Sequence, residues 1–157
     1  MKLTEILKLD KITIDFKGTT KEEIINEMID MFKGDERVTD LETIRTVVLE
    51  REEIMSTGVG SGFAIPHGKT NMVAEMVAGF GLLKNPIDFD STDGQPVNLI
   101  FLLIGQEDSV GQHIKMLSRI SRIMNQEAVR NRLANASSTE EIFQIFEEED
   151  NKYLELS

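Results

Sequence analysis

The sequence has no cysteine among its 157 residues, so disulfides, thiolate metal ligands and a cysteine nucleophile are excluded. It also lacks a long hydrophobic run. The longest, residues 99–104, is far shorter than the roughly 20 residues that a membrane-spanning helix needs. The first twenty residues mix charged and single apolar side chains, which excludes the apolar core of a signal peptide. We therefore expect a cytoplasmic protein with no direct membrane insertion.

Positive charge is also scarce. The chain has 17 Lys and Arg against 28 Asp and Glu, a formal net charge of −11. Phosphate backbones repel such a chain unless it carries a concentrated basic patch. The nearest candidates are five spread basic residues, interrupted by Glu127: Lys115, Arg119, Arg122, Arg130 and Arg132. We expect no nucleic-acid partner, and an acidic protein that meets phosphorylated or basic partner proteins fits better.

The length and an apolar content of 40% suit one domain with a proper core, spanning residues 1–157. Alternation or continuous apolar character predicts strands at three places: residues 12–16, 72–83 and 97–105. Turn residues fill 84–96. Helical spacing marks six segments: residues 3–9, 19–32, 41–53, 113–124, 127–133 and 139–149. This order predicts an α/β fold with a central mixed sheet flanked by helices.

Several helix starts carry capping residues. The candidates are Thr4 for the first helix, Thr20 with Glu23, Asp40 or Thr43, and Ser138 with Glu141. The acidic residues 147–150 end the last helix, and we expect them to be solvated.

Glycine is concentrated in residues 56–70, STGVGSGFAIPHGKT. Gly58, Gly60 and Gly62 allow a positive φ or the close approach of a bulky anion. The spacing is not the dinucleotide fingerprint, because Phe63 takes the place of its third glycine. The same residue excludes a Walker phosphate loop ending at Gly68. The glycines alone leave a plain turn and an anion-binding loop equally open.

His67, one of only two histidines, follows this loop. Pro66 fixes its own φ and favours extended geometry at Ile65, while Gly68 removes bulk on the other side. An imidazole held this way is exposed and constrained, and a pKa near 6.5 leaves it largely neutral and nucleophilic. The alternative is a histidine that donates to a backbone carbonyl in a turn.

His113, the second histidine, lies near a predicted helix start, where the helix dipole favours a neutral ring that donates a hydrogen bond. It also fits a half-buried position on an apolar stripe. Neither histidine has the short spacing typical of metal sites, so we expect no metal.

Arg51 precedes the loop, and it suits either an ion pair with Glu50 or Glu52 or a bidentate contact with a phosphoryl group. Ser56 and Thr57 are candidate hydroxyl donors.

Residues 51–68, RE(x)4STGVGSGFAIPHG, resemble the signature of IIA proteins of the bacterial phosphoenolpyruvate-dependent phosphotransferase system, of the fructose/mannitol/nitrogen-regulatory class. Residues 85–104 and 111–123 resemble the later strand of that family and the helix with its second histidine. The resemblance implies a mixed sheet flanked by helices. It makes His67 the phosphorylated residue, Arg51 the phosphate contact and His113 the second active-site histidine. Phe63 and Ile114 replace a smaller aliphatic residue and a leucine, which affects packing rather than chemistry.

The resemblance also implies the partners. Phospho-HPr would donate the phosphoryl group to His67, and no cofactor or metal would be required. The acceptor is either a IIB domain in sugar transport or a regulatory target, as in the nitrogen-type branch, which the segment DGQPV resembles. Docking partners call for an exposed apolar patch around His67, for which Phe63 and Phe80 are candidates.

Overall fold

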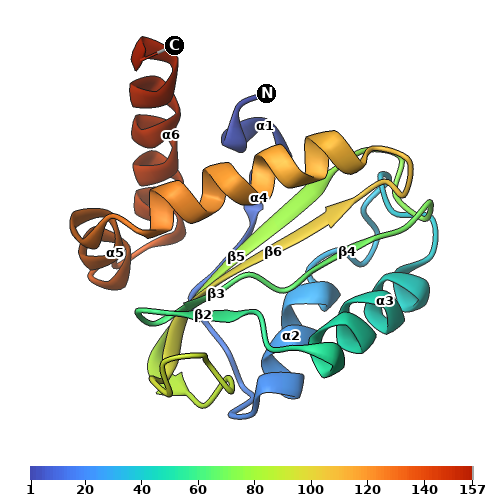
Figure 1. Ribbon diagram of the computed structural model, residues 1–157, viewed down its shortest axis with the longest axis horizontal. Coiled ribbons are helices and arrows are strands. Elements are labelled where there is room, and N and C mark those ends of the chain that lie inside the picture. The colour runs from blue at the N-terminus through green and yellow to red at the C-terminus, as the bar shows by residue number, and fades with distance from the viewer. Residues whose placement is uncertain (157) are drawn as a thin grey trace.

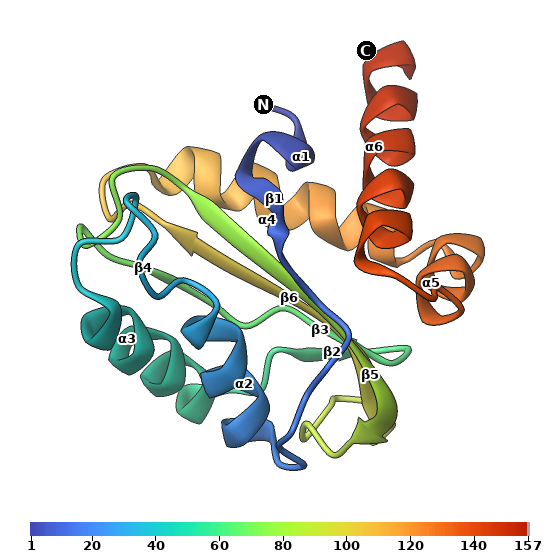
Figure 2. The same ribbon diagram turned by 180° about the vertical axis from the view of Figure 1, so that it is seen from behind.

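Helices flank both faces of one mixed β-sheet (Figures 1 and 2), and a hydrophobic core lies on each face. The computed structural model describes residues 1–156. The strands are β1 Leu7–Thr13, β2 Gly58–Gly60, β3 Phe63–Ala64, β4 His67–Lys69, β5 Val77–Ile87 and β6 Val97–Gly105. The helices are α1 Leu3–Ile6, α2 Lys21–Asp30, α3 Leu41–Ile54, α4 Val110–Met124, α5 Glu127–Ala134 and α6 Thr139–Leu156. The predicted α/β fold with a mixed sheet flanked by helices is confirmed.

The sheet is centred on β5 and β6, which pair antiparallel. Its order is β1-β5-β6-β3-β2, and β4 also pairs with β6. β1 is parallel to β5, and both β3 and β4 are parallel to β6. Alternate residues of β5 and β6 face the two cores, which explains why both strands are apolar on both faces.

The helices divide between these two faces. α2 and α3 cover one core, and α1, α4, α5 and α6 contribute to the other (Figures 1 and 2). In the part of the chain that the structure describes, no helix combines the length and apolarity needed to cross a membrane.

Two of the predicted helix caps are confirmed in full. Thr20 and Glu23 form a capping box at the start of α2, and the Asp40 carboxylate accepts from the first turn of α3. At α6 the prediction is only half right. Ser138 Oγ accepts from the Glu141 amide at 3.1 Å, but the Glu141 carboxylate accepts from Ser137, one residue before the expected position.

The N-terminal prediction was wrong in its boundaries. α1 ends at Ile6 and the strand begins directly at Leu7, five residues earlier than expected. Pairing with β5 sets this strand: Leu7 lies opposite Ala78 in the parallel register. Thr4 does not cap α1, since its hydroxyl donates to Asp150.

The predicted boundaries of the next strand were also shifted. β5 starts at Val77 rather than residue 72, and residues 84–87, expected in a turn, continue the strand until Ile87 pairs with Val97. A register irregularity separates Leu82 from Ile87, and a strand tolerates a proline such as Pro86 at such a point.

The acidic residues 147–150 are solvated only in part and do not end the last helix, since Glu147 is exposed and α6 continues to Leu156. Glu149 and Asp150 are buried, at 4% and 1% exposure. Asp150 accepts hydrogen bonds from the backbone of Leu3 and Thr4 and from the Arg119 guanidinium. Its carboxylate therefore joins α6 to α1 and α4, contacts between residues so far apart in the chain that local charge patterning does not indicate them.

Candidate functional site

His67 is the first residue of β4, which β6 holds in the sheet. The carbonyl of Pro66 accepts from the Leu103 amide at 3.1 Å. On the ring, Nδ1 lies 2.8 Å from the carbonyl oxygen of Ile65. Because a carbonyl oxygen only accepts, Nδ1 of the neutral ring carries the proton and Nε2 keeps its lone pair. The two interpretations of His67 are therefore compatible: the ring donates to a backbone carbonyl and still presents a nucleophilic nitrogen.

The glycine-rich loop before His67 forms a tight hairpin, β2 and β3. Gly60 and Gly62 take positive φ values of 109° and 85°, which glycine adopts at no steric cost. The amide of Gly58 donates to Ser56 Oγ, and that of Ser61 to the Asp93 carboxylate. These two amides are occupied within the protein, and the hairpin places the glycine-rich loop directly before His67.

His113 lies beside His67, with ring centroids 5.6 Å apart and ring planes tilted by 50°. The first turn of α4 carries it, and its side chain is 3% exposed. Among the described residues neither ring nitrogen has a hydrogen-bond partner. Burial lowers its pKa to about 4, and the charges of His67 and Lys69 act in the same direction. His113 is thus both a member of an apolar helix face and a neutral neighbour of His67.

The pKa of His67 is lowered as well. Burial is the main cause, and the positive charges of Arg51 and Lys69 contribute, while the Ile65 carbonyl and the Glu52 carboxylate act in the opposite direction. The ring is therefore neutral at pH 7, the form in which Nε2 is a nucleophile.

Arg51 lies in the last turn of α3, where the helix dipole favours a cation. Its Nη1 donates to the Met55 carbonyl at 2.9 Å. The ion pair considered with Glu50 or Glu52 does not form among the described residues. This backbone contact holds one nitrogen of the guanidinium, and the positive charge of Arg51 lowers the pKa of His67.

Two charged residues of this region were not singled out in the sequence. Glu52 is buried, and its carboxylate accepts from Thr57 N at 2.9 Å and Thr57 Oγ1 at 2.6 Å, with Lys21 Nζ 2.7 Å away. Lys69 is exposed and lies two residues after His67 in β4, on the same side of the strand. Lys69 could have been found from the sequence, because residues two apart in a strand lie on the same side as each other. For Glu52 the sequence offered no signal beyond its place next to Arg51.

The predicted hydroxyl donors are engaged elsewhere. Thr57 Oγ1 donates to Glu52, and Ser56 Oγ donates to the Phe89 carbonyl at 2.5 Å. Both side chains hold the start of the loop in place instead of pointing a free donor at His67.

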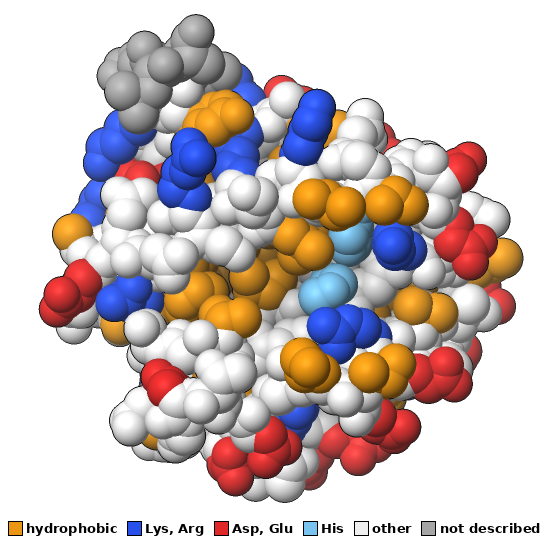
Figure 3. Space-filling view, viewed as in Figure 1, with side chains coloured by type: hydrophobic (Ala, Val, Ile, Leu, Met, Phe, Trp, Pro, Cys, Tyr) orange, Lys and Arg blue, Asp and Glu red, His pale blue; other side chains and the backbone are white. Residues whose placement is uncertain are grey.

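The two histidines lie next to each other at the molecular surface, bordered by hydrophobic and basic side chains (Figure 3). Exposed apolar residues occur on the segments that carry the site: Ile54, Met55, Val59, Val110 and Ile114. Phe63 and Phe80, predicted to contribute, are 2% and 0% exposed. That prediction was wrong because both rings point from their strands into the core under α4.

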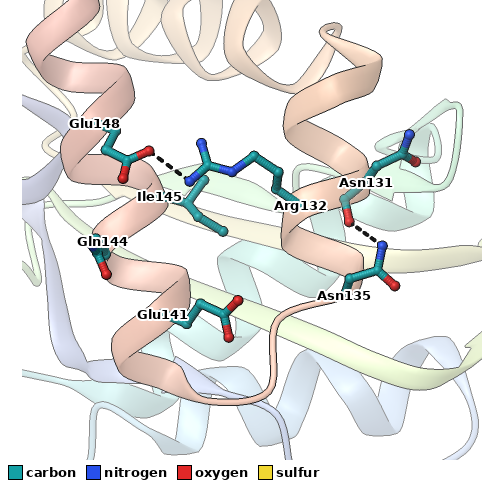
Figure 4. Close-up of a pocket in the computed structure, with 7 residues that line it drawn as sticks. All are labelled: Asn131, Arg132, Asn135, Glu141, Gln144, Ile145 and Glu148. Atoms are coloured by element: carbon teal, nitrogen blue, oxygen red, sulfur yellow. Dashed lines mark hydrogen bonds and ion pairs between the residues drawn. The ribbon is translucent and has the colours of Figure 1, made fainter.

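A cavity of about 470 Å³ lies between α5 and α6, elements that carry neither histidine (Figure 4). Its one basic side chain, Arg132, is paired, with Nη2 2.7 Å from Glu148, and Glu141 accepts from Ser137. Asn135 donates to the backbone carbonyl of Asn131. Over residues 1–156, no group of three or more His, Cys, Asp or Glu side chains is arranged to hold a metal ion. The histidine pair is therefore the candidate site.

A neutral, tethered histidine beside a second buried histidine and two cations is the arrangement expected of a histidine phosphocarrier. The family described as "Phosphoenolpyruvate-dependent sugar phosphotransferase system, EIIA 2" matches residues 5–149. The chain belongs to this family and is a phosphotransferase of its phosphohistidine-carrier class.

Known proteins similar to the chain carry both transport and regulatory names. The "PTS system fructose-specific EIIABC component" of Bacillus subtilis is 35% identical over 150 residues, which cover 96% of the chain and 24% of that protein. A "Nitrogen regulatory protein" of Bradyrhizobium diazoefficiens is 33% identical over 146 residues, 92% of the chain and 94% of that protein. The crystal structure of Nitrogen Regulatory Protein IIA-Ntr from Neisseria meningitidis superimposes with a TM-score of 0.85 at 33% identity, covering 92% and 98% of the two chains.

Proposed function

We propose that Nε2 of His67 accepts a phosphoryl group from phospho-HPr and passes it to a second protein, with residues 1–157 acting as one IIA domain. The hydrogen bond of 2.8 Å between His67 Nδ1 and the Ile65 carbonyl carries this proposal. It assigns the ring proton to Nδ1 and leaves the Nε2 lone pair on a partly exposed ring.

The transfer step needs no proton at the attacking nitrogen. The Nε2 lone pair forms the new P–N bond while the bond from phosphorus to the donor nitrogen breaks, and that electron pair stays on the donor. Positive charge then develops on the His67 ring, and the Ile65 carbonyl stabilises it by accepting from Nδ1–H. In the return step the ring leaves with its electron pair, so one tautomer serves both directions.

Three side chains stabilise the transferring group by charge and hydrogen bonding, which supply most of the catalysis of phosphoryl transfer. Arg51, which uses Nη1 for Met55, offers the rest of its guanidinium fork to the equatorial oxygens. His113 is neutral at pH 7 because its pKa is about 4, and it offers a ring N–H to a phosphoryl oxygen. Lys69 adds a second cation beside His67 on β4.

Two acceptors fit the family. We favour a regulatory target whose binding depends on the phosphorylation of His67, since nitrogen regulatory proteins of Bradyrhizobium diazoefficiens and Neisseria meningitidis are each 33% identical to the chain. A fructose- or mannitol-type IIB domain is the second candidate. The Bacillus subtilis relative, named a fructose-specific EIIABC component and 35% identical, favours it.

Phosphorylation with purified components tests the site. Incubated with phosphoenolpyruvate, enzyme I and HPr, the protein should gain one acid-labile phosphate, and His67→Ala should gain none. His113→Ala, the matched control, should still be labelled but transfer more slowly. Label retained in a folded His67→Ala variant would refute the assignment.

The choice of acceptor needs a separate assay. Labelled protein is mixed with a soluble fructose-type IIB domain, and the label is followed over time. A purely regulatory protein should keep its label, and rapid transfer to the IIB domain would refute that reading.

A further inference from the structure

Glu52 is a buried carboxylate in an unfavourable place. It is 6% exposed and lies in the last turn of α3, where the helix dipole disfavours an anion. Burying a charge is costly unless it is paired and hydrogen-bonded. Lys21 Nζ at 2.7 Å and the two donors of Thr57 meet that need. Neither Glu52 nor Lys21 has a role in the transfer described above, so their pairing calls for another explanation.

The ion pair is itself anchored. Lys21 is the first residue of α2, and its ammonium lies 4.9 Å from the centroid of the Phe89 ring. It donates to the Phe89 carbonyl and lies 3.6 Å from an Asp90 carboxylate oxygen. The Glu52 carboxylate thus joins the start of α2 to the end of α3 and to the loop that leads to His67.

From Glu52 a series of hydrogen bonds leads to the imidazole. Thr57 donates to Glu52 through both its amide and its hydroxyl. The Thr57 carbonyl accepts from the Ile65 amide at 3.1 Å. The Ile65 carbonyl then accepts from His67 Nδ1 at 2.8 Å. The oxygen that sets the tautomer of His67 is therefore positioned through Thr57 by an ion pair whose carboxylate is buried.

We propose that Lys21 and Glu52 are positioning residues that, through Thr57 and Ile65, keep the proton of His67 on Nδ1 and so keep Nε2 free for the phosphoryl group. This inference rests on the proposed function of His67. The pair acts on orientation and tautomer, since the bonds run through successive backbone groups and no proton passes along them. Loosening the pair lets the Ile65 carbonyl shift, and the Nε2–H form, which has no lone pair on Nε2, gains population.

The ¹⁵N chemical shifts of the ring nitrogens report the tautomer in the unphosphorylated full chain. They are measured near pH 7.5, and His113→Gln assigns the two histidines. The wild type should show the Nδ1–H form of His67. Glu52→Gln and Lys21→Met should show a mixture, and their phosphorylation by phospho-HPr should be about tenfold slower in kcat, with KM for phospho-HPr little changed. Glu53→Gln, the exposed neighbour in the same helix turn, should match the wild type.

Thr57 gives a second test if the charge variants do not fold. Thr57→Ser keeps both donors to Glu52 and should restore wild-type tautomer and rate, whereas Thr57→Val loses the hydroxyl and should shift both. Folded variants that keep the wild-type tautomer and rate would overturn the inference, even if their stability falls, because the pair would then be structural only. Failure of the wild type to be labelled on His67 would instead refute the proposed function, and the tautomer measurement would still decide the positioning role.

Discussion

The imidazole of His113 packs directly on Gly105, the last residue of β6. A Cβ atom at Gly105 would lie 2.5 Å from His113 Nδ1, closer than a Cβ atom approaches a non-bonded neighbour. The end of β6 thus provides the space for the second histidine, while the neighbouring strand β4 presents the first. The distance of 5.6 Å between the two rings depends on this bare backbone position.

Gly105→Ala should therefore displace His113 and slow the phosphorylation of His67 by about tenfold. The displaced ring should be more exposed, and its pKa should rise from about 4 toward the ordinary value, as followed by NMR titration. Gly111→Ala is the matched control, because a Cβ there meets nothing within 4 Å, and in a helix it should stabilise the protein by about 0.5–1 kcal/mol. An unchanged pKa of His113 in Gly105→Ala would contradict this account.

Acidification should destabilise the protein in part through His113. Its pKa is about 4 when folded against an ordinary 6.5, so between these values the unfolded chain binds a proton that the folded chain does not. The free energy of unfolding should therefore fall as the pH falls through this window. In His113→Gln the free energy of unfolding should depend less steeply on pH in this window. The difference in slope should correspond to at most one proton bound on unfolding. Urea unfolding at several pH values measures it, and an equal slope in both proteins would count against a buried neutral ring.

Arg51 and Lys69 should contribute unequally to transfer. Arg51→Ala should lower the rate of phosphorylation by about 100-fold, since it removes a fixed multidentate donor, and Arg51→Lys should recover only part of it. Lys69→Ala should cost several-fold, and less at high salt, because an exposed charge is screened. Lys84→Ala, an exposed lysine on β5, is the control. Time courses of phosphorylation, quenched at intervals, measure these rates at low and high salt. A larger loss of rate for Lys69→Ala than for Arg51→Ala would contradict the larger role given to Arg51.

Asp150 should matter for stability rather than transfer. It is 1% exposed, and its carboxylate pairs with Arg119 at 2.6 Å. Asp150→Ala leaves that guanidinium buried without its partner, which should lower the free energy of unfolding by about 3–5 kcal/mol. Glu147→Ala, exposed on the same helix, should change it by less than about 0.5 kcal/mol. A small loss in Asp150→Ala, measured by urea unfolding, would show that the pair contributes little.

Local sequence features predicted the parts of the fold that short-range physics controls. The capping residues Thr20 and Asp40 start α2 and α3 as expected, because an N-cap acts within one turn. Strand ends at β1 and β5 were misplaced because they depend on partner strands: Leu7 becomes a strand residue by pairing with Ala78. Such pairing is not visible in the residues near Leu7 themselves.

In the candidate site, too, the sequence indicated some residues and only the tertiary structure placed others. The family resemblance pointed to His67, Arg51 and His113, whereas the helix start and apolar stripe by themselves left His113 open between a packing and a functional role. The hydroxyls of Ser56 and Thr57 were misassigned, since their acceptors, Phe89 and Glu52, depend on how loop and helix pack. Phe63 and Phe80 were misassigned as exposed because only the sheet decides which way a strand residue points.

By itself, the sequence determined the α/β class through the order of its apolar segments, and the family through the resemblance of residues 51–68 to a known signature. That resemblance, rather than spacing, pointed to the histidine that Pro66 and Gly68 flank. Tertiary structure alone decided which nitrogen of His67 is free, since the Ile65 carbonyl must come within 2.8 Å of Nδ1. It also decided that the two histidines meet. His67 and His113 lie on different elements, and only the pairing of β4 with β6 and the packing of α4 on Gly105 bring their rings together.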